Sequence, residues 1–275
     1  MTLHAETHGD GPPLLMVHGL GGSVRSWDTI VHALSRSRHV ILIDLPGHGR
    51  TPPLTGPHTI AALADSLAGF IEERRLGAVD LVGSSVGARL VLELSRRGIG
   101  GNCVALDPGG FWRGWETTYF RTTLAVSIRL VRLLQPVMPF LSRHAVTRAL
   151  LLAQLSARPS TLASDLVLTE MRTFAATPVF DEVLRELATG PLQDGSSSTP
   201  GRVTIGWGRN DRLLLPRQAK RAQAAFPGAR LHWFDDCGHF PQWDQPQETV
   251  RVIWETIDVT TASPKLQPAN GASEG

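Results

Sequence analysis

Apolar and polar residues form two kinds of segment along most of the chain, short continuously apolar runs and longer amphipathic stretches. A strand that is apolar on both of its faces belongs in a sheet that is covered on both sides. Six such runs occur, at Leu14–Val17, Val40–Ile43, Val79–Val82, Cys103–Leu106, Val203–Trp207 and Leu231–Phe234. They predict a mostly parallel sheet at the centre of the protein.

Amphipathic stretches between these runs predict the helices that cover the sheet. They lie at about Thr59–Arg75, Val86–Arg97, Pro216–Phe226 and Gln247–Val259. Strands and helices that alternate in this way are typical of a doubly wound α/β fold. We therefore expect an α/β core made of residues 1–110 and 200–259.

The region 111–199 breaks this alternation, because no convincing apolar strand occurs in it. Amphipathic stretches punctuated by prolines predict helices there instead. They cover Thr118–Leu134, Arg143–Gln154, Ser160–Ala175 and Phe180–Leu187. We expect 111–199 to form a helical insertion in the core, and the small, polar, proline-bearing tail 260–275 to be disordered.

Length and charge limit the function classes. The 275 residues, 42% of them hydrophobic, are enough for one α/β domain with an elaboration. The 27 basic and 25 acidic residues give a formal net charge of +2, which argues against a nucleic-acid or acidic-membrane partner. We expect a small molecule as the partner, and neither nucleic acid nor membrane.

Targeting and cysteine patterns predict a reduced, cytoplasmic enzyme. The N-terminal residues contain no basic segment followed by a long apolar core, and no run of about 18 apolar residues occurs. Cys103 and Cys237 form no Cys-x-x-Cys pair, and two cysteines are too few for a disulfide framework. We expect both thiols to be buried and reduced.

The segment Gly83-Ser84-Ser85-Val86-Gly87 has the pattern Gly-x-Ser-x-Gly and lies between a predicted strand and a predicted helix. A sharp strand-to-helix turn exposes a serine hydroxyl to a base, and small flanking residues permit such a turn. The turn also places the serine at a helix N-terminus, where backbone N–H groups face a developing oxyanion. This context favours Ser85 as a nucleophile, and Ser84 competes only if the turn is shifted.

The glycine-rich segment His18-Gly19-Leu20-Gly21-Gly22-Ser23 directly follows another predicted strand. Glycines let the backbone approach a substrate closely. An ordinary strand-end turn has the same composition, but the Gly-x-Ser-x-Gly pattern elsewhere in the chain favours a functional one. We predict that the backbone N–H groups of Leu20 and Val86 form an oxyanion hole.

An acid for this site is predicted at a later strand end. Asp211 follows the run 203–207 and lies where a carboxylate would fix a histidine tautomer. Asp107, at the end of 103–106, is the rival acid. We favour Asp211 because it keeps the order serine, aspartate, histidine along the chain with a short spacing from its strand.

A base is predicted after the last strand. Of the ten histidines, only His232 and His239 follow Asp211. His232 lies inside an apolar strand, where a structural role is expected, whereas His239 lies on a loop beside glycine and is the predicted general base. Cys237 lacks the strand–turn–helix setting of a nucleophile. No metal-ligand spacing and no phosphate loop occurs, so we expect neither a metal nor another cofactor.

Together these motifs resemble the α/β-hydrolase family. The matching segments are HGLGGS at 18–23, DLPGHGR at 44–50, GSSVG at 83–87, GRNDR at 208–212 and CGHFPQWDQP at 237–246. The resemblance implies a nucleophile–acid–base triad, an oxyanion hole and a cap after the family's sixth strand. In this sequence these correspond to Ser85, Asp211 and His239, to the N–H groups of Leu20 and Val86, and to residues 111–199. Because only thirteen residues precede Leu14, we expect seven strands rather than the family's eight.

Within the family, the C-terminal stretch resembles actinobacterial esterases and the hydrolases that break carbon–carbon bonds in aromatic ring-cleavage products. The ring-cleavage enzymes usually have tryptophan where this chain has Phe240. They also use a cap arginine to hold a carboxylate, and none of the cap arginines, which include Arg121, Arg129 and Arg172, can be singled out for that role.

We therefore expect an esterase that acts on a small to medium apolar or aromatic substrate through an acyl-enzyme. Gly19, Ser84 and Phe240 are the candidate pocket residues. Two alternatives stay open. One is a carbon–carbon bond hydrolase of ring-cleavage products, and the other is a slow-turnover ligand-binding or signalling protein that keeps the triad.

Overall fold

The central feature of the computed structural model, which describes residues 2–257, is a seven-stranded sheet. The strand order is β1-β3-β2-β4-β5-β6-β7, and all neighbours are parallel except β1 and β3. The strands are β1 (Ala5–His8), β2 (Pro13–Val17), β3 (His39–Ile43), β4 (Asp80–Ser84), β5 (Cys103–Leu106), β6 (Val203–Gly208) and β7 (Arg230–Phe234). The expected mostly parallel sheet of seven strands is confirmed.

The strand β1 comes from a segment in which the sequence predicted none. It pairs antiparallel with β3, with Ala5 opposite Ile43 and His8 opposite Val40. It forms one edge of the sheet, and its residues are half-buried or exposed. An edge strand of this kind lacks the continuous apolar run of the central strands, because helices do not cover it on both faces.

Alternate residues of each central strand enter two separate apolar cores, one on each face of the sheet. In β3, Ile41 and Ile43 lie in the first core, whereas Val40 and Leu42 lie in the second. Successive side chains of a strand point to opposite faces. Burial on both faces therefore requires the continuous apolar runs that the sequence contains.

Helices cover both faces of the sheet. The first core is closed by α2 (Ile60–Glu73), α3 (Val86–Arg96) and α9 (Arg217–Ala225), and the second by α1 (Val31–Leu34) and α11 (Pro246–Ile257). Thr59 begins α2 as expected, since its hydroxyl accepts a hydrogen bond from the Ala62 N–H at 3.1 Å. The predicted end of the last helix at Val259 and the predicted disordered tail 260–275 lie outside the described residues.

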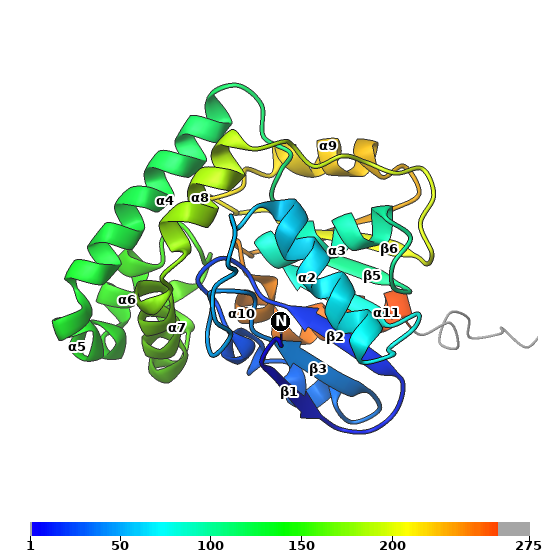
Figure 1. The fold of residues 1–275 in the computed structure, drawn as a ribbon. Coiled ribbons are helices and arrows are strands. Elements are labelled where there is room, and N and C mark those ends of the chain that lie inside the picture. Colours follow the sequence, from blue (N-terminus) through cyan, green and yellow to red (C-terminus); the bar gives the residue numbers. More distant parts are fainter. Residues whose placement is uncertain (1, 258–275) are drawn as a thin grey trace, which may run out of the picture.

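Between β5 and β6 the chain forms five α-helices, two short 3-10 helices and, within 111–199, no strand. Figure 1 shows these helices grouped beside the sheet. They are α4 (Trp115–Leu133), α5 (Met138–Arg143), α6 (Ala145–Leu151), α7 (Ser164–Ala176) and α8 (Phe180–Thr189). The sequence did not predict α5, because Pro136 and Pro139 interrupt its pattern. Pro139 is the second residue of α5, where the missing N–H costs no helical hydrogen bond.

None of the described helices is by itself long and apolar enough to cross a membrane. The helix α4 and the following segment Gln135–Arg143 together have the necessary length and composition, but they are bent by 60° relative to each other.

Candidate active site

The candidate site lies where the carboxyl ends of the parallel strands meet, because the loops after β2, β4, β5, β6 and β7 all leave this edge of the sheet. Ser85 directly follows β4 and precedes α3. Its backbone has φ 57° and ψ −113°, in the left-handed region that a non-glycine residue rarely adopts. A serine in such a turn projects its hydroxyl clear of the strand and the helix.

Glycines on both sides of Ser85 make this turn possible. A Cβ atom on Gly83 would lie 2.3 Å from the Gly87 carbonyl oxygen, and one on Gly87 would lie 2.0 Å from the Val17 carbonyl oxygen. Both distances are far below van der Waals contact, so a larger residue would push α3 away from the sheet. Close approach of the backbone is therefore the physical reason for the Gly-x-Ser-x-Gly pattern.

Ser85, His239 and Asp211 form one hydrogen-bonded series. The Nε2 atom of His239 lies 2.9 Å from Ser85 Oγ, and Nδ1 lies 2.8 Å from Asp211 Oδ2. An ionised Asp211 can only accept, so His239 carries its proton on Nδ1 and leaves Nε2 free to accept the Ser85 hydroxyl proton. The His239 and Asp211 side chains are fully buried, so bulk water does not compete for their bond.

Asp211 is held in place by the backbone that follows it. Its Oδ1 atom accepts hydrogen bonds from the N–H groups of Leu213 at 2.7 Å and Leu214 at 2.9 Å. Hydrogen bonds from N–H groups to a carboxylate are among the stronger ones in proteins. They fix the oxygen that does not face His239 and so aim the other oxygen at the ring.

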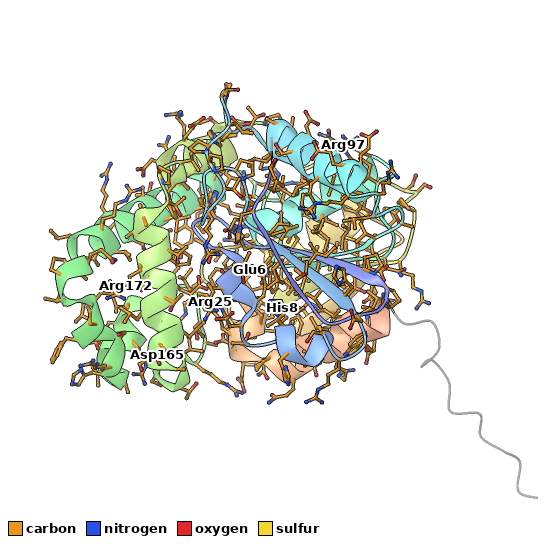
Figure 2. All side chains as sticks on the ribbon, turned by 60° about the horizontal axis from the view of Figure 1, so that its bottom comes forward. Glu6, His8, Arg25, Arg97, Asp165 and Arg172 are labelled. Atoms are coloured by element: carbon orange, nitrogen blue, oxygen red, sulfur yellow. The ribbon has the colours of Figure 1, made fainter. Side chains whose placement is uncertain are left out.

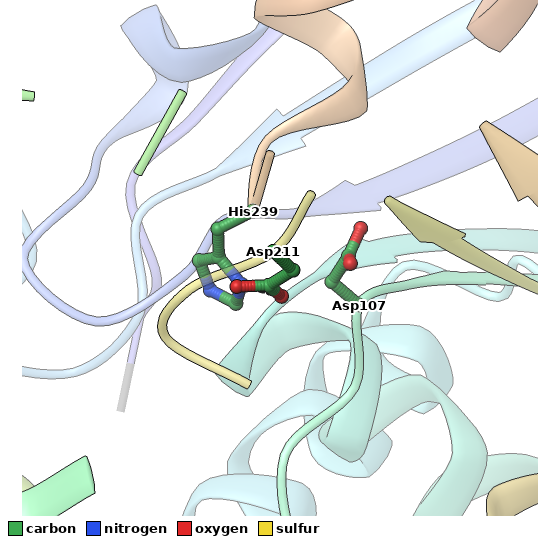
Figure 3. Close-up of side chains that lie close together, drawn as sticks. All are labelled: Asp107, Asp211 and His239. Carbon is green, nitrogen blue, oxygen red and sulfur yellow. Dashed lines mark hydrogen bonds and ion pairs between the residues drawn. The ribbon is translucent and has the colours of Figure 1, made fainter. Parts of the chain in front are cut away.

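Asp107, the rival acid, lies next to this pair, as Figure 3 shows, but is bound elsewhere. Its Oδ1 atom accepts a hydrogen bond from the Gly208 N–H at 2.9 Å. In the described chain no hydrogen bond joins it to His239. Burial, and then the charge of the neighbouring Asp211, raise the pKa of Asp107 well above its usual range. Of the two carboxyl groups, Asp211 is the one that orients the histidine.

Gly19 and Leu20 lie directly beside Ser85. A Cβ atom on Gly19 would come within 3.0 Å of the Ser85 Cβ, so a larger residue would crowd the hydroxyl. Leu20 and Val86 line the same pocket as Ser85. Within residues 2–257, the N–H groups of Leu20 and Val86 donate to no protein acceptor. Two free N–H groups beside a serine are suited to stabilise an oxyanion.

His18 ties the glycine-rich loop to the end of β3. Its Nε2 atom accepts a hydrogen bond from the Leu45 N–H at 3.0 Å, so the ring proton is on Nδ1, which donates to the Gly19 carbonyl oxygen at 2.7 Å. Burial lowers the pKa of His18 to about 4. The neutral ring is therefore a structural link between two strand ends, and it makes no contact that catalysis would use.

Asp244 binds the histidine loop to the helical insertion. This buried carboxylate accepts hydrogen bonds from the Gly238 N–H at 2.7 Å and from the Ala157 N–H at 2.8 Å. The His239 N–H donates to the Leu155 carbonyl oxygen at 2.8 Å. Leu155 and Ala157 belong to the insertion, so the insertion contributes to holding the backbone of His239.

A pocket opens over Ser85 and His239. Apolar side chains from α4, α6, α7 and α8 form most of its wall. Besides Ser85 and His239, the polar lining residues are Ser127 and Gln154, and the Ser127 hydroxyl lies 3.4 Å from Gln154 Oε1. No aspartate, glutamate, lysine or arginine of the described chain lines this pocket. Its surface is suited to a neutral, apolar ligand.

Of the three predicted pocket residues, Phe240 lines this pocket. Gly19 lines a smaller cavity next to it. Ser84 is buried, and its hydroxyl accepts a hydrogen bond from the side-chain amide of Gln242 at 3.2 Å. The structure therefore places Ser84 outside the pocket and Ser85 inside it.

The remaining candidates have structural positions. His232 lies on β7, and its ring pairs with the Glu248 carboxylate at 3.1 Å rather than with Asp211. Cys103 and Cys237 are both free and buried, as expected. Burial raises the pKa of each thiol, so neither residue is a reactive thiolate.

Beside the pocket lies a tightly packed space, too small for a water molecule, that the sequence did not predict. Three buried atoms of its lining residues have no hydrogen-bond partner in the described chain, namely Glu170 Oε1, Gln242 Oε1 and Trp243 Nε1. Glu170 Oε2 accepts a hydrogen bond from the Ser26 hydroxyl at 3.3 Å, and burial raises the pKa of Glu170 to about 8.

Asp107, Asp211 and His239 also offer ligand atoms within 4.8 Å of one another, which is a spacing that a metal ion can use (Figure 3). These residues are too far apart in the sequence to show as a metal motif. Asp211 and His239 already bond to each other, and Asp107 accepts from Gly208. A cation bound to all three residues would have to break the Asp211–His239 bond, so we assign Asp211 and His239 to the series with Ser85, and Asp107 to its hydrogen bond with Gly208.

The sequence profile of the Alpha/beta hydrolase family matches residues 14–252 of the chain. The acetoin-cleaving system of Cupriavidus necator contains a similar protein, its dihydrolipoyllysine-residue acetyltransferase component, which is 28% identical over 258 residues. The match covers 89% of this chain but only 63% of that relative, so the chain spans less than two thirds of its length.

Two further proteins are similar over most of both chains. The 2-hydroxy-6-oxo-2,4-heptadienoate hydrolase of Pseudomonas putida is 28% identical over 260 residues, which cover 89% of this chain and 88% of the relative. The solved structure of a thermophilic esterase from Thermogutta terrifontis superposes with a TM-score of 0.72 at 21% identity and covers 92% of each chain. At this identity the structural likeness shows a shared fold.

Proposed function

Because the chain belongs to the alpha/beta hydrolase family, we propose that it hydrolyses carboxylic esters through an acyl-enzyme formed on Ser85. The observation that carries the proposal is the hydrogen-bonded series from Ser85 through His239 to Asp211, which lies at an apolar pocket. A serine becomes an effective nucleophile when a base accepts its proton and a third group orients that base. The distances of 2.9 and 2.8 Å meet this requirement.

Each step uses atoms that are already in place. His239 Nε2 takes the hydroxyl proton as Ser85 Oγ attacks the ester carbonyl carbon, and the N–H groups of Leu20 and Val86 donate to the resulting oxyanion. His239 then returns the proton to the leaving alkoxide. A water molecule, deprotonated by His239, then attacks the acyl carbonyl carbon; the bond from this carbon to Ser85 Oγ breaks, His239 gives the proton to Ser85 Oγ, and the acid is released. Asp211 holds the ring in its tautomer and stabilises the imidazolium throughout.

The pocket favours an ester whose acyl group is neutral and apolar or aromatic. A free carboxylate placed in this apolar lining would lose its hydration without gaining a counter-charge, which costs several kcal/mol. Phe240 packs against the His239 ring, with 4.8 Å between the ring centroids, and keeps this side of the pocket apolar. We propose a small to medium acyl or aryl ester as the substrate class.

Carbon–carbon bond hydrolysis is the second candidate, because the Pseudomonas putida relative is named for a heptadienoate and matches over most of its length. Such a substrate carries a carboxylate. The insertion arginines Arg121, Arg129 and Arg172 are exposed, and none of them lines the pocket. Figure 2 shows Arg172 at the surface of α7. The missing counter-charge favours the ester hydrolase.

Hydrolysis of p-nitrophenyl esters of graded acyl length, compared with a ring-cleavage dienoate, tests the proposal. We expect turnover of the neutral esters, little turnover of the dienoate, and loss of turnover in Ser85→Ala. Ser66→Ala, on α2 and away from the pocket, is the matched control and should keep full activity.

Other results would replace the proposal. Undiminished turnover in Ser85→Ala would contradict the mechanism. Turnover of the dienoate alone would make the protein a carbon–carbon bond hydrolase. Tight binding of an ester without turnover would favour the slow-turnover ligand-binding or signalling alternative.

A further inference from the structure

The outer side of the helical insertion exposes a group of apolar side chains. Of the nine large hydrophobic side chains exposed in residues 2–257, seven lie between positions 126 and 150. We call these seven the insertion face: Val126, Leu130, Leu133, Val137, Phe140, Val146 and Leu150. Leu133, Val146 and Leu150 expose 75%, 73% and 76% of their surface. Grouped exposure of this kind marks an interaction surface.

The helix α4 is apolar on two sides. Val126, Leu130 and Leu133 follow one another at intervals of four and three residues, which places them on one side of α4. Val137 follows in the segment that bends away from α4 by 60°. The opposite side of α4 carries buried residues such as Ile128 and lines the pocket over Ser85. The inner side therefore has a partner within the described chain, and the outer side has none there. Figure 1 shows α4, α5 and α6 at the edge of the molecule away from the sheet.

Positive charge is concentrated around the insertion face. Residues 117–164 contain six arginines and no acidic residue, although the whole chain is nearly balanced. Arg132 pairs with Asp181 at 2.6 Å. Arg129 on α4 and Arg143 at the end of α5 are exposed and make no ion pair with any described residue. The face is thus apolar with uncompensated cations beside it.

A groove runs along this side of the insertion and adjoins the candidate active-site pocket. Leu130 and Leu150 of the insertion face line it. The groove and the pocket share four residues, Ser127, Val131, Leu151 and Gln154. A ligand that lies in the groove is therefore separated from the pocket over Ser85 by one layer of side chains.

We propose that the insertion face docks on an anionic phospholipid surface and that the groove admits ester substrate from that surface. Apolar side chains then lie at the acyl boundary, and Arg129 and Arg143 lie at the lipid phosphates. A second copy of this chain is a poorer occupant, because a symmetric pairing would bring the same unpaired arginines together. Delivery of substrate rests on the ester hydrolase proposed above, whereas docking itself does not.

Co-sedimentation of the full chain with vesicles tests the docking. We expect vesicles of phosphatidylcholine and phosphatidylglycerol to retain the protein, vesicles of phosphatidylcholine alone to retain much less, and binding to weaken as salt rises. The double variant Leu133→Asp and Val146→Asp should bind the anionic vesicles about ten-fold more weakly or worse. Leu192→Asp, an exposed leucine outside the insertion face, is the matched control and should bind like the parent.

The outcomes separate docking from chemistry. The circular dichroism spectrum of the double variant should match that of the parent, since both side chains are exposed. Ser85→Ala should still bind vesicles if docking is independent of turnover, and such binding without any esterase activity in the parent would overturn the proposed function alone. Equal binding to both vesicle types, unchanged binding of the double variant, or self-association through this face without vesicle binding would overturn the docking proposal.

Discussion

At the scale of single residues, the site depends on Ser85 being held in a backbone conformation that its glycine neighbours permit. His239 and Asp211 reach Ser85 from loops that are distant in sequence. Neither bond depends on a surface charge, because the histidine and the aspartate are fully buried. The chemistry of the site therefore depends on the tautomer of one imidazole, and that tautomer depends on Asp211.

Replacing Asp211 by asparagine tests this dependence. The side-chain amide would donate to Nδ1 and move the ring proton to Nε2, so kcat for a p-nitrophenyl ester should fall by about four orders of magnitude. Asp107→Asn is the matched control and should keep most of the activity, because Asp107 accepts from Gly208 rather than from His239. Steady-state kinetics of both variants provide the measurement, and an equal loss in the two would show that Asp107 also acts on the histidine.

Glu170 gives a prediction about stability and pH. Its pKa of about 8 lies above the ordinary value of 4.5, with Ser26 bonded to it and Asp28 and Arg25 as the charged groups nearby. Between these two pH values the folded chain keeps a proton that the unfolded chain releases, so the free energy of unfolding falls as pH rises through this window.

Glu170→Gln removes that titration. The free energy of unfolding of the variant should exceed that of the parent by little near pH 4.5. The difference should grow as pH rises toward about 8 and stay constant above it. Urea unfolding at a series of pH values measures the difference, with the exposed Glu73→Gln as control. A difference between parent and variant that does not change with pH would show that Glu170 is not the titrating group.

The sequence predicted the residues whose role follows from a strand end, and it missed those whose role arises from packing. Ser85, Asp211 and His239 each follow an apolar run, and the structure brings them together. Glu170 lies on an amphipathic helix like any solvent-facing glutamate, and only the packing of α7 against the glycine-rich loop buries it. The predicted pocket residue Ser84 directly precedes Ser85. Successive side chains of a strand point to opposite faces, however, so the Ser84 side chain points away from the pocket.

At the scale of elements, the six central strands and most helices could be predicted because burial imposes a strong pattern on them. The strand β1 could not, since it lies at the edge of the sheet and is only half covered. The helix α5 could not, since Pro136 before it and Pro139 at its second position interrupt the pattern, although Pro139 does not break the helix. The link between the histidine loop and the insertion was also missed, because Asp244 meets Gly238 and Ala157 only in the folded chain.

Asp244 acts through His239 and is therefore predicted to be a positioning residue. Asp244→Ala leaves the buried Gly238 N–H and the half-buried Ala157 N–H without their acceptor, which should lower the free energy of unfolding by about 2–3 kcal/mol and kcat/KM with it. Asp244→Asn keeps one acceptor oxygen and should restore part of kcat/KM.

Thermal unfolding and esterase kinetics of both Asp244 variants give the measurement, with Asp165→Ala as control. Figure 2 shows Asp165 at the surface of α7. A loss of stability with kcat/KM unchanged at low temperature would mean that Asp244 does not position the histidine.

At the scale of the whole molecule, the net charge concealed an uneven distribution of charge along the sequence. The net charge of +2 combines residues 117–164, which contain six arginines and no acidic residue, with the rest of the chain, in which 25 acidic residues outnumber 21 basic ones. That average led to the expectation of no membrane partner, whereas the distribution of charge and exposed apolar surface supports the docking proposed above. The two cores and the continuous apolar strands, by contrast, could be read from the sequence, since burial on both faces leaves no other pattern.

The proposed function requires a covalent bond between the acyl group and Ser85. An apolar p-nitrophenyl alkylphosphonate ester should release one nitrophenolate per chain, abolish esterase activity in proportion, and add its phosphonyl mass to the tryptic peptide 76–89, with fragmentation placing that mass on Ser85. Ser85→Ala should take up no label. Label on Ser84 or on a residue outside this peptide, or ester turnover that persists in Ser85→Ala, would contradict the proposed role of Ser85 as the nucleophile.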